Sequence, residues 1–316
     1  KVLGTTVAFG KTIHAIWGIK VKGETQLTQD VKIIPFEEVP DSEQKQRLTN
    51  VPFSHPMASV MSMLLRTPPE SALIMARRIE PLIFDPGIQP MSTDDVFKTR
   101  ELLEEITLVL TVVGPRVAIL APRWFIYDDP DLQQASMMSG WGSGGRFREI
   151  LPGWLNDYPV LDSIEAPQIV QDYLALKGDT RSKVRVALQR FNQALCRGNA
   201  GDRAVELSTA LEALLGEKDV RIEMTHKIKV RSVRLIGGED KVRMKNAVII
   251  KKAYDIRGDL VHTGHVDAAK SYAICGESMS DSDFIDQEFL IGANLIKIII
   301  RRGSIPDWSI FDITEH

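Results

Sequence analysis

The spacing of apolar residues in the second half of the chain constrains the fold more than any other sequence feature. From residue 184 onward, apolar side chains recur every three or four positions, which places them on one face of a helix. The first such set is Val184, Ala187, Leu188, Phe191, Ala194 and Leu195. A second helix is expected from Asp202, the predicted N-cap, to Leu215, with Gly216 as the stop signal.

Two longer helices are expected further along the chain, at residues 240–262, ending at Gly264, and at residues 283–302. The second of these is rich in Leu and Ile, and its segment from Phe284 to Ile300 is a candidate for part of a dimer interface. The stretch from Lys227 to Ile236 alternates like a strand, and its pattern alone leaves it undecided between strand and helix. Helices should therefore dominate this half.

The first half carries short β-branched and apolar runs instead. Strands are expected at residues 2–9, 13–21, 31–36 and 116–127, with turns at Gly10 and Gly23. Residues 71–84 are ambiguous between strand and helix, whereas residues 93–113 follow a cap signal and predict a helix. The predicted fold class is α+β, with a mixed α/β or β-rich domain at residues 1–160 and an all-α helical bundle at residues 165–316.

A loop rich in small residues lies between these halves. Gly140, Gly142 and Gly145 have the spacing of a dinucleotide-binding fingerprint. Such glycines bind a pyrophosphate only between a strand and a helix, and neither pattern flanks them here. We interpret the segment as a flexible loop and place the interdomain linker between Ile150 and Pro167.

Composition limits the class of protein. A length of 316 residues allows about two domains. No apolar run approaches the length of a membrane span, and the first residues lack the features of a signal peptide, so a cytoplasmic protein without membrane contact is expected. Cys196 and Cys275 lie among apolar neighbours, outside any metal-binding spacing, and are expected to be small core residues. We expect no cofactor and no metal, and His265, three residues after His262, has no further ligand cluster beside it.

The net charge of −3 argues against a nucleic-acid partner unless basic residues cluster. They do cluster between Arg221 and Lys252, where ten Lys and Arg face three acidic residues. A run of this kind is commonly a solvated helical surface. The alternative is an RNA-binding surface, for which the candidates are Lys227, Lys229, Arg231, Arg234, Lys251 and Lys252.

The strongest chemical candidates follow this basic segment. On a helix, Ile250, Ala253, Tyr254, Arg257 and Val261 share one face, so Arg257 emerges from an apolar stripe. A guanidinium there requires a carboxylate or an anion, and one reading is a structural ion pair with Glu212 of the second helix.

His262 lies about 140° further around the same helix than Arg257. Asp255 and Asp259 lie on its side, where a carboxylate could orient the imidazole for proton transfer. A lone histidine at a helix end is otherwise a capping or packing residue. Gly258 inside the helix indicates a kink, a close contact or an early end.

The segment from Ala253 to Gly264 resembles the signature of the HEPN superfamily, in which Arg and His are separated by four to six residues. The wider sequence is similar to the Apea-like HEPN family over roughly 120 residues. The matching features are Arg190-Phe191, the spacing to Asp202, the block Ala210-Leu211-Glu212-Ala213-Leu214, and Lys229 with Arg231 before Leu235. This resemblance assigns residues 227–236 to a helix.

The resemblance implies a metal-independent endoribonuclease that acts as a homodimer on RNA. The ribose 2′-hydroxyl would attack the phosphorus and leave a 2′,3′-cyclic phosphate. His262 would transfer protons, Arg257 would hold the phosphate, and Asp259, Glu212 and Tyr254 would support them. The family also implies an antiviral defence role as an abortive-infection toxin, with a sensing ligand or partner on the N-terminal domain. The alternatives are a non-catalytic HEPN dimerisation or RNA-binding module, and a purely structural helical domain.

Overall fold

The computed structural model describes residue 5 and residues 7–49, 68–81, 93–136, 159–217, 223–263, 271–274 and 277–314. The chain divides into two compact units. The first comprises residues 1–110 and 117–170, and the second comprises residues 111–116 and 171–316. An α+β fold class is confirmed, because the first unit carries an antiparallel sheet and the second is mainly helical.

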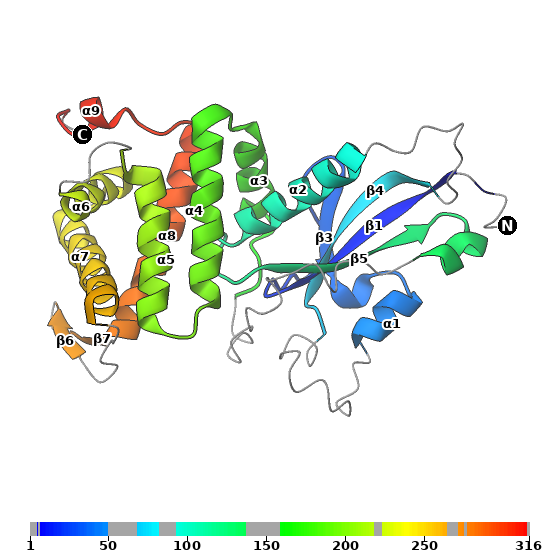
Figure 1. Ribbon diagram of the computed structural model, residues 1–316, viewed down its shortest axis with the longest axis horizontal. Helices are drawn as coiled ribbons and strands as arrows, with labels where there is room; N and C mark the ends of the chain where they lie inside the picture. Colours follow the sequence, from blue (N-terminus) through cyan, green and yellow to red (C-terminus); the bar gives the residue numbers. More distant parts are fainter. Residues whose placement is uncertain are drawn as a thin grey trace. The chain divides into compact units, whose positions relative to one another are not determined.

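A five-stranded antiparallel sheet, in the order β2-β3-β4-β1-β5, organises the first unit (Figure 1). Its strands are β1 (Val7–Trp17), β2 (Thr25–Gln26), β3 (Val31–Pro35), β4 (Ser71–Pro81) and β5 (Ile119–Tyr127). Ile13 of β1 lies opposite Ile74 of β4 and Trp124 of β5, and all three side chains are buried. Such cross-strand apolar contacts stabilise the centre of a sheet.

The expected turn at Gly10 is wrong, because β1 runs through this residue. Gly10 pairs with Arg78 on one side and Tyr127 on the other, beside an irregularity in the register. A Cβ at this position would lie 2.1 Å from the carbonyl oxygen of Ile126. Gly10 therefore permits a close approach of two strands rather than a change of chain direction.

The first unit also contains the helices α1 (Glu43–Thr49) and α2 (Thr93–Leu110) and the short 3₁₀ segments η2 (Phe36–Glu38) and η5 (Pro130–Ala135). The expected helix at residues 93–113 is confirmed except for its last turn. The ambiguous stretch beginning at residue 71 is a strand. Its first residues, Ser71 to Ile74, are all buried, which explains why it lacks a clear alternation.

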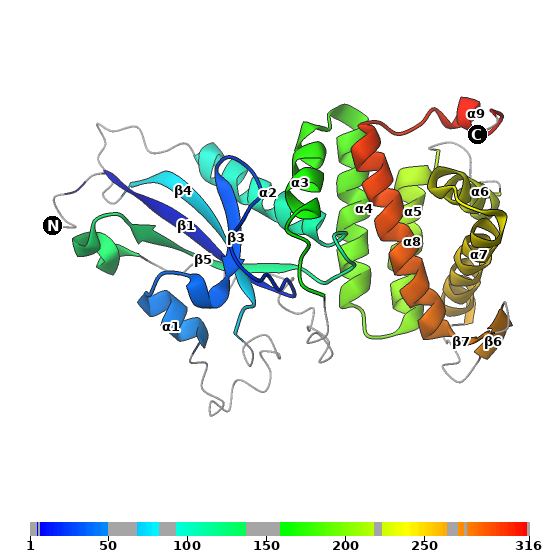
Figure 2. The same ribbon diagram turned by 180° about the vertical axis from the view of Figure 1, so that it is seen from behind.

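The second unit is built around α4 (Gly178–Cys196), α5 (Ala200–Leu215), α6 (Met224–Ile236), α7 (Asp240–Thr263) and α8 (Asp281–Arg302), with the short α9 (Trp308–Phe311) near the C-terminus. Helix α5 contacts α4, α7 and α8. Viewed from behind, α8 runs beside α4 and α5 (Figure 2).

The predicted apolar stripe of α4 is confirmed, since all six of its side chains are buried. Helix α5 ends at Gly216 as predicted, but its N-cap is Asn199, whose side chain accepts a hydrogen bond from the backbone N–H of Asp202. Asp202 is therefore not the cap. Cys196 is buried, as expected.

Two elements of this half were not expected. Helix α3 (Glu165–Ala175) begins inside the predicted linker. A hairpin of β6 (Ser271–Ile274) and β7 (Glu277–Ser280) precedes α8, so an entirely helical second half is wrong for these residues. Among the helices described, none is both long and apolar enough to cross a membrane.

Candidate functional site

Arg257 of α7 makes an ion pair with Glu212 of α5. The Arg257 Nη1 atom donates to Glu212 Oε1 at 2.5 Å, and both side chains keep about a third of their surface exposed, at 32% and 30%. Glu212 was considered at the sequence level as the structural partner of this arginine. The pair exists, and it lies at the edge of the core rather than within it.

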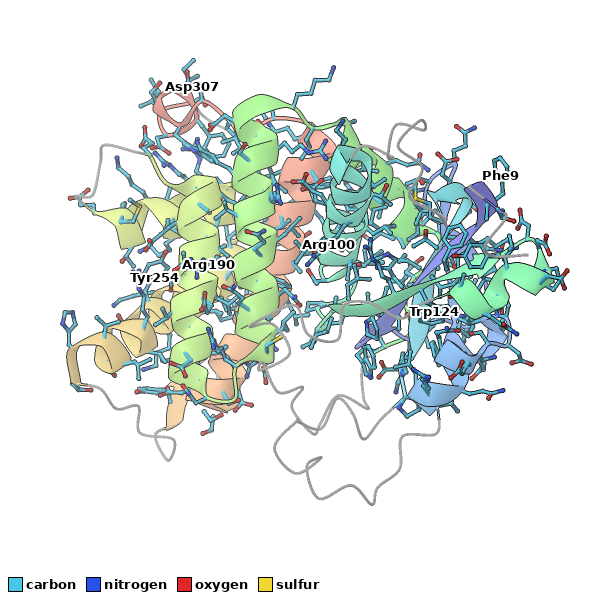
Figure 3. The ribbon with its side chains drawn as sticks, turned by 45° about the vertical axis from the view of Figure 1, so that its right-hand side comes forward. Phe9, Arg100, Trp124, Arg190, Tyr254 and Asp307 are labelled. Carbon is cyan, nitrogen blue, oxygen red and sulfur yellow. The ribbon has the colours of Figure 1, made fainter. Side chains whose placement is uncertain are left out.

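Tyr254 lies one turn before Arg257 and faces the same helix α5. Its hydroxyl is 3.5 Å from both the Ser208 carbonyl oxygen and Glu212 Oε1, while the Arg257 guanidinium lies 5.6 Å from the ring centroid. Burial raises the pKa of Tyr254 well above its usual value, and the charges of Glu212 and Glu288 raise it further. Tyr254 is labelled within the helical unit in Figure 3.

His262 stands on the last turn of α7, and its side chain is exposed. Because α7 continues without interruption to Thr263, Arg257 and His262 remain about 140° apart around one helix. Asp255 and Asp259 are also exposed, and neither forms an ion pair with His262 in the described part of the chain. A single chain therefore does not bring the imidazole to the guanidinium.

Two expectations about this helix are wrong. Val261 is 62% exposed and so does not belong to the buried stripe, whereas Ile250, Ala253 and Tyr254 do. Gly258 neither ends the helix nor permits a close contact, since a Cβ there would meet nothing within 4 Å.

The arginines of α6 bind protein groups instead of facing solvent. Arg231 is 1% exposed and donates to Asp312 Oδ2 at 2.5 Å, to Glu217 Oε2 at 2.7 Å and to the Leu215 carbonyl oxygen at 2.5 Å. The hydrogen bond from Arg231 lowers the pKa of the Asp312 carboxyl, and the same cause lowers the pKa of Glu217.

Arg234 binds the same C-terminal segment as Arg231. It donates to the carbonyl oxygens of Asp312 and Thr314, and the aromatic rings of α9 stack on the two guanidinium groups, Trp308 on Arg231 and Phe311 on Arg234. These two arginines therefore hold the C-terminal segment, and their guanidinium groups are engaged there rather than available to RNA.

Lys252 also has a local role. Its ammonium lies 3.8 Å from Asp281 and 3.5 Å from the ring centroid of Tyr272, so it holds the hairpin near α8. Lys227 pairs with Glu217 at 3.4 Å. Of the six RNA-binding candidates, Lys229 and Lys251 are those with neither an ion pair nor a side-chain hydrogen bond to the described residues.

The two residues of α4 that carried the family resemblance have local roles within the helical unit, one in packing and one in an exposed ion pair. Phe191 is fully buried and meets Phe289 edge to face, with ring centroids 5.4 Å apart. Arg190, labelled in Figure 3, donates to Glu206 at 3.0 Å. They support the bundle around α5 rather than contact Arg257.

Glu288 of α8 is a titratable residue of this region that sequence reasoning missed. It is fully buried, and neither carboxyl oxygen has a hydrogen-bond partner among the residues described. Burial alone raises its pKa well above 4.5. A sequence signal existed, because Glu288 interrupts the apolar face of the predicted helix one turn after Phe284.

Several sequence expectations lie outside the described residues. They are the glycine-rich loop with Gly140, Gly142 and Gly145, the helix stop at Gly264, and the residues His265 and Cys275. Within the described part, no group of three or more His, Cys, Asp or Glu could hold a metal ion.

Comparison with known proteins gave no match to this chain among family models, curated proteins or solved structures. The proposals below therefore depend on the sequence resemblance and on the geometry of the site.

Proposed function

We propose that this chain is a HEPN-type, metal-independent endoribonuclease. The observation that carries the proposal is that α7 presents a partly exposed guanidinium, held by Glu212, and an exposed imidazole five residues later. These two groups suit RNA cleavage by internal attack of the 2′-hydroxyl, which requires proton transfer and stabilisation of phosphorane charge but no metal.

Arg257 retains binding capacity although it is paired. A guanidinium has five N–H donors in a planar fork, and within the described residues only Nη1 is bonded. The carboxylate of Glu212 fixes the orientation of the fork and leaves Nη2 and Nε for phosphate oxygens. Arg257 therefore binds the scissile phosphate. Glu212 orients the guanidinium of Arg257, and the hydroxyl of Tyr254 supports the Glu212 carboxylate.

His262 requires a second copy of the chain. Five residues along a helix separate two positions by about 7.5 Å along the axis and 140° around it. Pairing of two α7 helices would supply two imidazoles to one cleft, one for each proton transfer. Asp259 is exposed and lies three residues before His262, so in this proposal it would face the same cleft.

RNA binding rests on fewer basic residues than the sequence suggested. We assign Lys229 and Lys251 to contact with the RNA backbone, since neither forms an ion pair with the described residues. The defence role and the sensing function of the N-terminal unit follow from the family resemblance, and we propose them together with the cytoplasmic location that the composition suggests.

The direct experiment measures cleavage of end-labelled RNA in the presence of EDTA by the wild type, Arg257→Ala and His262→Ala. We expect each substitution to reduce the rate about 100-fold or more, because general acid–base groups contribute roughly 10²–10⁴-fold and donors that stabilise transition-state charge about 10²–10³-fold. The products should carry a cyclic phosphate, and an all-deoxy oligonucleotide should stay intact because it lacks the attacking hydroxyl.

The matched control is His226→Ala, since His226 is an exposed histidine on α6, outside the site. It should cleave RNA like the wild type. Equal cleavage by all four proteins, or cleavage by none of them, would reject the nuclease.

A second candidate is a non-catalytic HEPN module for dimerisation or RNA binding. The observation that favours it is the short Arg257–Glu212 pair within one chain, which balances the charge of the guanidinium without a bound phosphate. In that case Arg257→Ala would lower the melting temperature, and the wild type would bind RNA or dimerise without cleaving RNA.

A further inference from the structure

Helix α6 carries three basic residues on one face, at intervals of four and three positions. They are Lys227, Arg231 and Arg234, and this spacing places their side chains in one line along the helix. The segment of residues 307–314, which contains α9, bonds to this face and lies at the same end of the helical unit as α6 (Figures 1 and 2). The contacts between them indicate which kind of molecule the face can bind.

The Asp312 carboxylate lies against the Arg231 guanidinium as a phosphate group would. Arg231 Nε donates to Asp312 Oδ1 at 2.9 Å, and Nη2 donates to Oδ2 at 2.5 Å, so two donors reach two oxygens. Arginine binds phosphate oxygens with the same bidentate geometry. The hydrogen bond from Arg231 lowers the pKa of Asp312, and the charges of Lys227 and Arg234 lower it as well. The cations of this face thus converge on one anion.

Two aromatic rings of the same segment lie over the guanidinium groups. The centroid of the Trp308 ring is 4.8 Å from Cζ of Arg231, and the centroid of the Phe311 ring is 5.0 Å from Cζ of Arg234. Proteins that recognise single-stranded RNA stack its bases on arginine guanidinium groups. The segment therefore presents to α6 the groups that a nucleotide presents, with rings in place of bases and a carboxylate in place of a phosphate.

Arg234 depends on this segment for every side-chain hydrogen bond that it makes in the described part of the chain. It donates to the backbone carbonyl oxygens of Asp312 and Thr314. Arg231 differs, because it also donates to Glu217 and to a backbone carbonyl oxygen of α5. If the segment leaves, Arg231 stays anchored to the fold, and Arg234 becomes free to bind a phosphate.

The outward side of the segment faces water. Ile310 and Ile313 are 56% and 83% exposed, whereas Trp308 and Phe311, which face α6, are 5% and 6% exposed. Apolar side chains that stay exposed contribute little to holding a segment in place. The contacts on the inward side are made to guanidinium groups, and RNA bases and phosphates can replace them.

We propose that this face of α6 is a binding site for single-stranded RNA, which residues 307–314 occupy in the present conformation by imitating a nucleotide. Displacement of the segment exposes Arg234 and the donors of Arg231 that Asp312 now takes. The choice of RNA as the ligand rests on the proposed function, whereas its binding can be measured without any cleavage.

The first experiment measures the affinity of the full chain for a fluorescent single-stranded 2′-O-methyl RNA oligonucleotide, which internal attack cannot cleave. The double variant Asp312→Asn/Phe311→Ala removes the imitated phosphate and one imitated base. It should bind at least about tenfold more tightly than the wild type at low salt. The slope of log affinity against log salt should be steeper by about 1.4, from about 0.7 for each of two freed cations. An unchanged affinity or an unchanged slope would overturn the proposal.

The matched control for this variant is Ile310→Ala/Glu239→Gln. It removes an exposed side chain of α9 and one exposed negative charge of the helical unit, but no contact with α6. The control should bind the oligonucleotide like the wild type. An equal gain in affinity by the control would mean that net charge causes the gain, and the covered site would be rejected.

The second experiment locates the gain. Adding Arg234→Gln to the double variant should remove most of the gain, whereas adding Lys241→Gln, which neutralises an exposed lysine of α7, should preserve it. A duplex of the same length should gain less affinity, because its paired bases cannot stack on protein side chains. Full gain without Arg234, or an equal gain for the duplex, would contradict a single-strand site on α6.

Circular dichroism establishes whether each variant folds. If the double variant unfolds, Asp312→Asn alone decides, since it keeps the shape of the side chain and should still steepen the salt dependence by about 0.7. If the variants bind as expected but unmodified RNA is not cleaved, the nuclease function is rejected and the binding site remains. If the wild type cleaves RNA but the variants gain no affinity, only the covered site is rejected.

Discussion

Arg231 and Arg257 both form ion pairs in the helical unit, but their surroundings give them different capacities. Arg231 is 1% exposed and bonds to two carboxylates and a carbonyl oxygen, so no donor is directed to solvent. Arg257 bonds to one carboxylate and is about a third exposed. At the residue scale, burial rather than residue type therefore separates a structural arginine from a candidate phosphate ligand.

Arg231→Ala should destabilise the protein by about 2–3 kcal/mol, because it leaves the Leu215 carbonyl and two carboxylates without their shared donor. The measurement is urea unfolding followed by circular dichroism. Lys229→Ala is the matched control from the same helix and should change stability by less than about 0.5 kcal/mol. Equal effects of the two substitutions would contradict the assignment.

The ion pair of Arg231 with Asp312 adds a pH dependence to this effect. The folded-state pKa of Asp312 is lowered, so the pair stabilises the fold above the ordinary aspartate pKa. This contribution is lost as the pH falls through the folded-state value. The difference in the free energy of unfolding between the wild type and Arg231→Ala should therefore become smaller at acidic pH.

At the element scale, the glycines of β1 and α7 show opposite constraints. Gly10 lies where two strands approach closely, with a hypothetical Cβ at 2.1 Å from a backbone oxygen. Gly258 lies in an open part of a continuous helix. The sequence indicated an irregularity at both positions. Only Gly10 is required by its surroundings, because the neighbouring strand leaves no room for a Cβ.

Gly10→Ala and Gly258→Ala should thus change stability in opposite directions. The first should destabilise the sheet by more than about 1 kcal/mol, since the backbone must shift to admit the methyl group. The second should stabilise α7 by up to about 1 kcal/mol through helix propensity. Melting temperatures of the two variants test both signs, and a stabilised Gly10→Ala would disprove the close approach of β1 and β5.

Helices with a clear apolar stripe were predictable to within a few residues, and α4 is the best example. The stripe predicts burial because apolar residues at every third or fourth position lie on one face of the helix, and that face is stabilised when it packs against the core. Helix α6 was not predictable from its pattern, because its arginines bind the C-terminal segment and one of them, Arg231, is as buried as an apolar residue. The hairpin of β6 and β7 was missed because these strands are only four residues long.

At the scale of the whole molecule, the proposed chemistry requires two chains. Arg257 faces α5 of its own chain, while His262 is exposed on another side of the same helix. If the active form is a dimer in which each site uses residues of both chains, a chain that lacks His262 should inactivate its wild-type partner.

Mixing the wild type with a ninefold excess of His262→Ala tests this requirement. After subunit exchange, only about one tenth of the wild-type chains keep a wild-type partner, so activity per wild-type chain should fall about tenfold. The same excess of His226→Ala should have no effect. Unchanged activity with the His262 variant would mean that each chain cleaves RNA alone.

The sequence by itself determined the α+β class, the positions of most of the main helices and the presence of Arg257 and His262 on one helix, because these depend on local periodicity. Only the tertiary structure decided which charged groups are free. It paired Arg257 with Glu212, buried Arg231 against Asp312 and enclosed Glu288. The physical reason is that the energy of a charge depends on its surrounding water and partners, and distant segments of the chain supply both.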